Sequence, residues 1–279
     1  KLKADLKGDK GFGHISRLYA QRARTAPPKL GGRDDWLAYR AAMRKALEDL
    51  LGKPLPSRGA AKAAPTLERD GVAIERILVP SEGNILVPVL IVRPAACVGK
   101  LPVVISCDDG GKDASLAGTG AGSPVALARG GTFVVLPDVR FVGEVSLRAM
   151  AGLTQGLLTF KACCPLAEGD PASFEGAWQR HAMLWGRPLP GMAATDLRSV
   201  LDYVSARREA DADRITLRAR GGVAFGALFA AALDERVAAL DIDLGGRCFG
   251  KRNAPLVPFV LRHGDVLQWA AVMADRRHT

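Results

Sequence analysis

The residues from Asp211 to Val237 carry the clearest chemical pattern of this chain: a strand, a tight glycine turn and a helix. Ile215–Leu217 is a short apolar run typical of a strand, and Ala224–Leu233 is rich in Ala and Leu, which favours a buried helix. Gly221 and Gly222 between them allow the backbone to turn sharply without a Cβ clash. A turn of this kind can present a serine nucleophile in Gly-x-Ser-x-Gly, with the following N–H as an oxyanion donor. The pattern therefore predicts a strand, a sharp turn and a helix, with glycine at the centre of the turn.

The same run resembles the acetylxylan-esterase-like branch of the α/β-hydrolases, where DPDRIG…GxSxGG…AAALDERV is a familiar series. When both ends are aligned without a gap, Gly-x-Ser-x-Gly falls on Ala219, Gly221 and Val223, so Gly221 takes the nucleophile position. A later stretch, VPFVLRHGDVLQWAAVMADRR, is similar to VPGxLRxxDLPDLAALLAPRP of that family, and the resemblance covers roughly residues 34–275. It implies an α/β-hydrolase fold, carboxylic ester hydrolysis that deacetylates a carbohydrate, and a periplasmic or secreted location, although the N-terminus KLKADLKGDK contains no signal-peptide core.

The catalytic groups of a serine hydrolase can be sought one by one from this alignment. Gly221 has no side chain, and Arg220 precedes it where His often stands. The backbone N–H of Gly222 would be the first oxyanion donor, which no substitution removes. The second donor would come from the loop that usually reads His-Gly-x-Gly, which here begins with Asp108 and Asp109. Because Gly221 offers no nucleophile, we expect ester hydrolysis near background, and two carboxylates at the oxyanion hole would further oppose it by repelling a developing anion.

Several other polar residues are candidates for ligand binding at the carboxyl edge of the predicted sheet. These possible ligand-edge residues are Asp138, Arg140, Arg220 and Asp243. A hard cation would need several converging oxygens, whereas Asp108, Asp109 and Asp113 are also typical caps of helices and turns. The glycines from Gly221 onward do not have dinucleotide-binding spacing. We therefore expect neither a metal nor a cofactor. None of the four histidines, His14, His181, His263 and His278, lies where the family's base would be.

Composition limits the remaining functions. Of 279 residues, 48% are hydrophobic, which is enough for a sizeable core, and no apolar run approaches the length of a membrane span. The net charge is +10, but Lys and Arg are spread along the chain rather than clustered, so we expect no specific nucleic-acid binding. The cysteines are odd in number and lack metal spacing, which predicts free thiols; they are Cys97, Cys107, Cys163, Cys164 and Cys248.

The strand, turn and helix around Gly221, called the elbow from here on, lie among elements that alternate between strand and helix. This alternation predicts an α/β fold with a mostly parallel central sheet flanked by helices. Residues 1–69 form an N-terminal arm and helix, and residues 70–279 form the hydrolase-like domain with a lid-like insertion at 141–187. The expected helices span 34–51, capped by Asp34 or Asp35, then 123–129, 192–207 and 224–233; the expected strands span 72–79, 85–92, 103–106, 132–136, 215–217 and 237–242. The first two strands are expected to pair as an antiparallel hairpin.

The family continues with further strands where this chain stops, so the resemblance implies a C-terminally truncated domain. The strand at 237–242 would then be an exposed sheet edge, which a partner chain, a missing segment or the N-terminal arm could cover. Three interpretations follow: a non-catalytic relative that binds a carbohydrate, small ester or protein, a segment of a larger esterase, and an active esterase with an unusual site.

Overall fold

The computed structural model describes residues 21–22, 29–146, 179–250 and 254–274. Its strands are β1 (Lys62–Ala63), β2 (Leu67–Arg69), β3 (Val72–Pro80), β4 (Leu86–Pro94), β5 (Leu101–Asp108), β6 (Phe133–Pro137), β7 (Ala210–Arg220) and β8 (Val237–Asp243). Its helices are α2 (Arg33–Leu51), α3 (Gly111–Leu116), α4 (Pro124–Arg129), α8 (Leu189–Ser205), α9 (Val223–Leu233) and α10 (Val266–Ala271), with 3-10 turns η1 (Gly143–Val145) and η2 (Val260–Arg262).

The strands form one sheet in the order β1-β3-β4-β6-β5-β7-β8, with β2 paired to β3. Pairing is antiparallel from β1 to β6 and parallel through β6, β5, β7 and β8, the part that carries the elbow. The predicted hairpin is confirmed as β3 and β4, in which Val79 faces Val87 across the turn. In the described part of the chain, no strand pairs with the outer edge of β8, and what covers this edge stays a prediction.

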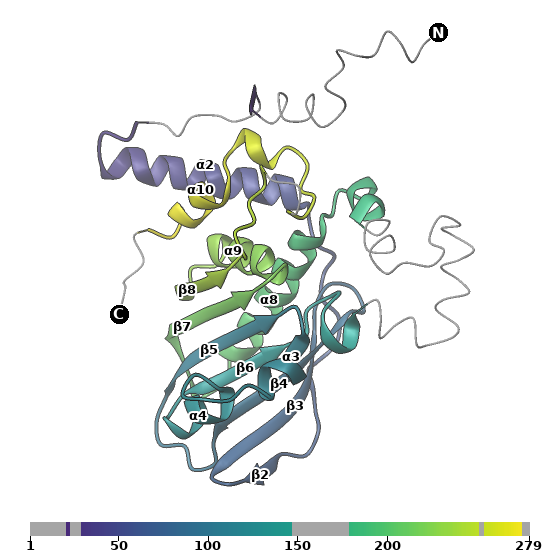
Figure 1. Ribbon diagram of the computed structural model, residues 1–279, viewed down its shortest axis with the longest axis vertical. Helices are drawn as coiled ribbons and strands as arrows, with labels where there is room; N and C mark the ends of the chain where they lie inside the picture. The colour runs from purple at the N-terminus through teal and green to yellow at the C-terminus, as the bar shows by residue number, and fades with distance from the viewer. Residues whose placement is uncertain (1–20, 23–28, 147–178, 251–253, 275–279) are drawn as a thin grey trace, which may run out of the picture.

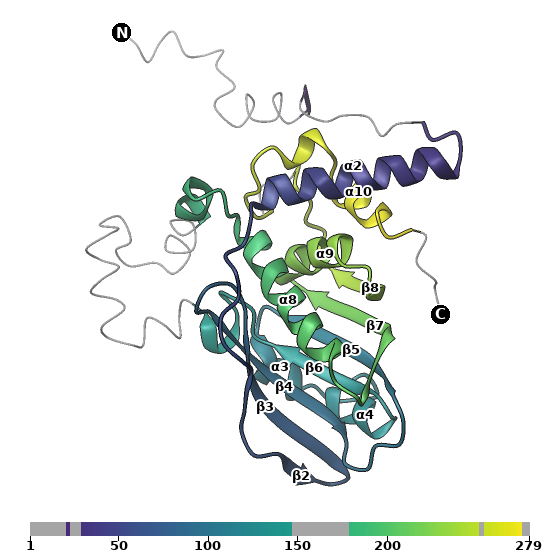
Figure 2. The ribbon, with the colours of Figure 1, turned by 180° about the vertical axis from the view of Figure 1, so that it is seen from behind.

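Helices cover both faces of the sheet. Figure 1 shows α3 and α4 on one face, and Figure 2 shows α8 on the other, with α9 beside it under α2. Strand β4 is buried on both sides because its side chains alternate: Val89 and Ile91 enter the larger core with α8 and α9, whereas Leu90 and Val92 enter a smaller core under α4.

Helix α2 belongs to the larger core. Its Met43, Leu47 and Leu51 are buried in the same cluster as α9, and Arg44 donates a 3.0 Å hydrogen bond to the Ala232 carbonyl near the end of α9. The expected division of the chain at residue 69 stays a prediction.

The cap of α2 and the start of α8 differ from expectation. The N-cap of α2 is Gly32, in the extended conformation, so capping by Asp34 or Asp35 was wrong; Asp35 instead accepts from the Gly31 N–H at 2.9 Å. Helix α8 begins at Leu189, three residues before the predicted start, because Pro190 fits the first helical turn, where its missing N–H costs nothing.

The lid-like insertion predicted at 141–187 lies mostly outside the described residues, as do Cys163, Cys164, His14 and His278. The other cysteines, Cys97, Cys107 and Cys248, are free thiols. Within the described residues, no helix is both long and apolar enough to cross a membrane.

Candidate functional site

The predicted sharp turn between β7 and α9 is confirmed. Strand β7 ends at Arg220, Gly221 has a φ of +87°, and Gly222 is the N-cap residue of α9. The Gly221 N–H donates to the Asp243 carbonyl of β8 at 2.9 Å, which fixes the turn to the neighbouring strand. Helix α9 is buried from Val223 to Ala232, so the turn is held against a rigid core. The elbow frame is therefore present, at the carboxyl edge of the parallel strands.

The carboxylate of Asp109 occupies the N-terminus of α9. The Gly222 N–H donates to its Oδ2 at 2.7 Å, and the Val223 N–H donates to its Oδ1 at 2.9 Å. The register of β5 and β7 explains why Asp109 lies close to the start of α9. Asp108 at the end of β5 pairs with Arg220 at the end of β7, so the residues that follow the two strands lie side by side. The first N–H groups of a helix have no partner within it and carry partial positive charge, which favours an anion here. The predicted first oxyanion donor, Gly222, thus already bonds an anion of this chain.

The missing side chain at Gly221 makes room for that carboxylate. A Cβ built on Gly221 would lie 2.2 Å from Asp109 Oδ2 and 2.4 Å from its Cγ. Such distances are far inside van der Waals contact. The same test at Gly222 gives 3.5 Å to Asp109 Oδ1, an ordinary contact. The carboxylate therefore fills the space that a residue 221 side chain would need.

A loop after β8 brings a guanidinium to the same point. Arg247 Nη2 lies 3.8 Å from Asp109 Oδ2, and Arg247 Nε donates to the Leu244 carbonyl at 2.9 Å. Two residues later, Phe249 stacks on Phe229 of α9 with ring centroids 5.6 Å apart. The loop is thus anchored on the elbow helix, and its cation lies beside the Asp109 carboxylate.

Of the predicted ligand-edge residues, Asp138 faces the interior. Its carboxylate is 1% exposed and accepts from the backbone N–H and the Nζ of Lys112, each at 2.7 Å, and from the Glu144 N–H at 2.9 Å. Burial lowers the pKa of Lys112, but its hydrogen bonds to Asp138 and Glu144 outweigh this and raise the pKa above its usual value. Asp138 therefore joins η1 to α3 within the fold.

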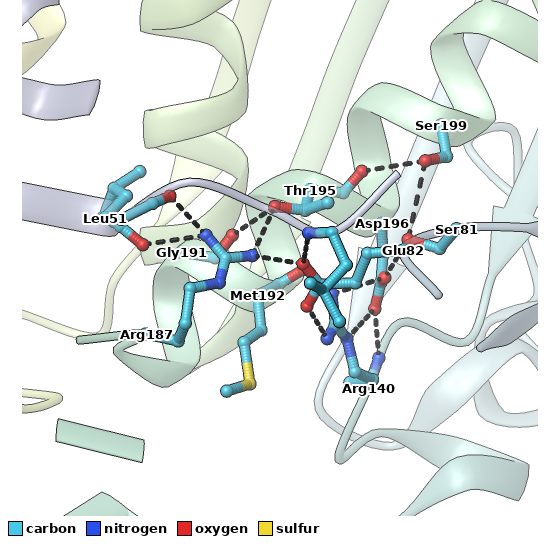
Figure 3. Close-up of polar contacts among 12 residues, drawn as sticks. Leu51, Ser81, Glu82, Arg140, Arg187, Gly191, Met192, Thr195, Asp196 and Ser199 are labelled. Carbon is cyan, nitrogen blue, oxygen red and sulfur yellow. Dashed lines mark hydrogen bonds and ion pairs between the residues drawn. The ribbon is translucent and has the colours of Figure 1, made fainter. Parts of the chain in front are cut away.

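Arg140, the second predicted edge residue, lies in a buried ionic network between α8 and the β3–β4 turn (Figure 3). Its Nε donates to Asp196 Oδ2 at 3.0 Å, its Nη2 donates to the Met192 carbonyl at 2.9 Å, and its Nη1 donates to Glu82. Arg187 binds the other oxygen of Glu82 at 2.8 Å. Burial raises the pKa of Glu82, but the hydrogen bonds and charges of the two arginines outweigh it, so the net pKa lies below its usual range.

The two remaining edge residues, Arg220 and Asp243, are exposed at the carboxyl ends of β7 and β8. Arg220 Nη1 lies 3.7 Å from Asp243 Oδ2, and Asp243 Oδ1 accepts from the Gly245 N–H at 2.8 Å. Asp108 similarly accepts from the Gly110 N–H at 2.8 Å, as in an Asx turn. These side chains accompany Asp109 and Gly221 at one edge of the sheet, whereas Asp138 and Arg140 do not reach that surface.

Solved structures with this architecture include several esterases. A Bacteroides fragilis protein assigned as an acetyl xylan esterase matches with a TM-score of 0.73 at 16% identity, over 96% of this chain and 74% of that one. The chain therefore shares the α/β-hydrolase fold of this structure. A methylesterase (TM-score 0.56, 14% identity) matches over 95% of this chain and 53% of its own. A glucuronoyl esterase from Solibacter usitatus (TM-score 0.56, 14% identity) matches over 87% of this chain and 73% of its own. No protein-family profile and no curated protein sequence matches the chain.

Among the described residues, no group of three or more His, Cys, Asp or Glu side chains is placed to hold a metal ion. His181 lies beside Trp185 with ring centroids 6.3 Å apart, and His263 lies beside Trp269 at 6.5 Å. Both distances place these imidazoles against aromatic side chains of their own segments.

Sequence reasoning missed how Asp109 is used. It identified the carboxylate as repulsive to an anion, but not as the group bonded to the α9 N–H groups. The available signal was the joint presence of Gly at 221 and Asp at 109, since a short acidic residue can cap a helix only where space is free. The position of Arg247 could not be predicted from the sequence, because tertiary contacts of its loop determine it. These contacts are made by Phe249 and by Asp265, which accepts a hydrogen bond from the Phe249 N–H at 2.9 Å.

Proposed function

We propose that this chain is an α/β-hydrolase-fold protein whose elbow does not hydrolyse esters, a degenerate relative of carbohydrate esterases. The observation that carries the proposal is the Asp109 carboxylate seated on the N–H groups of Gly222 and Val223. The neighbouring folds include enzymes named for acetyl xylan and glucuronoyl esters, which supports an esterified carbohydrate as the ligand class.

The chemistry supports this proposal in two steps. Acyl transfer at the elbow begins with attack by a side-chain nucleophile, and Gly221 supplies only hydrogen. The tetrahedral intermediate then needs backbone donors that are free to bind its oxyanion. Here the Gly222 N–H, the expected first donor, already bonds the Asp109 carboxylate, so a developing anion would meet charge repulsion where an esterase supplies stabilisation.

The proposal is tested by assaying the purified chain on p-nitrophenyl acetate and on acetylated xylo-oligosaccharides. We expect turnover at background for the unmodified protein and for Gly221→Ser, because the space that the new side chain needs is taken by the Asp109 carboxylate and a serine without a positioned base is a weak nucleophile. Gly131→Ser, at another glycine of positive φ, is the matched control for introducing a serine. A turnover above roughly 1 per second, within the usual enzyme range, that a serine-directed inhibitor abolishes would contradict the proposal.

A further inference from the structure

One side chain joins the loop after β5 to the elbow helix. Asp109 uses both carboxylate oxygens for this contact, one on Gly222 and one on Val223, although its side chain is 53% exposed. It thus caps α9 from the loop after β5, a role that the N-cap residue itself cannot perform because Gly222 has no side chain.

The same contact excludes a side chain from the nucleophile position. A Cβ at Gly221 would meet three atoms of Asp109 within 3 Å: Oδ2 at 2.2 Å, Cγ at 2.4 Å and Oδ1 at 2.9 Å. The carboxylate is held in place by its two backbone donors, so it cannot move away without losing them. A side chain at 221 and the capped position of Asp109 are therefore alternatives.

We infer that Gly221 and Asp109 form a matched pair, in which the carboxylate takes the volume that a side chain at 221 would need and occupies the Gly222 N–H, the expected first oxyanion donor. The inference deepens the proposed function, and its meaning as a closed site rests on that proposal. The consequence of the pair for folding does not rest on the proposed function, because the pair stabilises the strand-to-helix junction whether or not an ester binds there.

The chain offers matched controls for both residues. Gly131 has a φ of +86°, almost the value at Gly221, and among the described residues no atom lies within 4 Å of a Cβ built there. Gly131→Ala therefore measures the cost of a side chain at positive φ without the clash. Asp113 is an exposed carboxylate in the first turn of α3, so Asp113→Ala measures the loss of a nearby negative charge that does not cap α9.

The experiment is a double-mutant cycle in urea unfolding, with Gly221→Ala, Asp109→Ala and the double variant beside the two controls. We expect Gly221→Ala to lower the unfolding midpoint more than Gly131→Ala does. In the Asp109→Ala background, the loss caused by Gly221→Ala should shrink to that of Gly131→Ala. Asp109→Ala should lower the midpoint more than Asp113→Ala, because only the former leaves two helix N–H groups without their carboxylate.

Additive losses in the cycle, or a Gly221→Ala loss no larger than that of Gly131→Ala, would overturn the matched pair. If Gly221→Ala does not fold, recovery of a folded protein in the double variant supports the inference, and failure of both while Asp109→Ala folds overturns it. The readout involves no substrate. Esterase turnover by the unmodified chain would therefore contradict the proposed function alone, whereas an additive cycle would contradict the pair alone.

Discussion

Removing the cation at the centre of the buried ionic network should strongly destabilise the domain. Arg140 is 10% exposed and lies between two carboxylates, Asp196 at 0% and Glu82 at 9% exposure. In Arg140→Met the aliphatic bulk is retained and the charge is lost. Glu82 keeps Arg187 as its counter-ion. Among the described residues, the hydrogen bonds that Asp196 keeps come from neutral donors, the hydroxyl of Ser81 at 2.6 Å and the backbone N–H of residue 140 at 2.9 Å.

The expected magnitude follows from that arrangement. Breaking a buried ion pair by removing one partner leaves an uncompensated charge and costs about 3–5 kcal/mol. We therefore expect Arg140→Met to lower the free energy of unfolding by an amount in this range. The second variant, Asp196→Asn in the Arg140→Met background, removes the stranded charge and should recover part of the loss. The exposed pair Lys45–Asp49, at 72% and 67% exposure, gives the control: Lys45→Met should change the free energy of unfolding far less than Arg140→Met, because water screens an exposed pair.

The assay is urea unfolding followed by far-ultraviolet circular dichroism at pH 7, where the free energy of unfolding is extrapolated to water. The reasoning would be refuted by an Arg140→Met loss within about 1 kcal/mol of the Lys45→Met control. It would also be refuted if Asp196→Asn lowered the free energy of unfolding by the same amount in the Arg140→Met background as in the unmodified protein, because the two side chains would then act independently.

Two further predictions concern stability at acid pH and the packing of helix α2. The pKa values of Glu75 and Glu82 lie below the ordinary 4.5, because the effect of their arginine partners outweighs that of burial. The stability that these carboxylates add is therefore present above pH 4.5 and is lost as the pH falls through the pKa of the folded state. The unfolding midpoint should decline below about pH 4.5, and Glu82→Gln should flatten that decline; an unchanged slope would contradict the assignment. Leu47→Ala, at a fully buried position of α2, should cost about 2–5 kcal/mol, whereas Leu37→Ala on the same helix, 41% exposed, should change stability by about 0.5 kcal/mol or less. Equal losses would show that α2 is not part of the core.

The fold was predictable from local sequence patterns, which can be recognised without knowing the tertiary contacts. Apolar runs such as Val103–Ser106, followed by polar turns, predicted buried parallel strands, and β5 and β6 pair in parallel as expected. The elbow was predictable because glycine at positive φ and an Ala-rich helix are both encoded within a few residues. Helix boundaries were predicted less accurately, since the start of α8 depends on Pro190 and the cap of α2 on backbone geometry at Gly32.

The sequence alone determined the strand–turn–helix at Gly221, the absence of a side-chain nucleophile there and the acidic loop at Asp108 and Asp109. It could not place the carboxylates, because a side chain's partner depends on which strands become neighbours. The β5–β7 register set Asp109 against α9, and packing against α8 placed Arg140 with Asp196 in the interior rather than at the ligand edge. Only the tertiary structure decided these roles, since residues over 100 positions apart, such as Asp109 and Gly222, interact through pairing that no local pattern encodes.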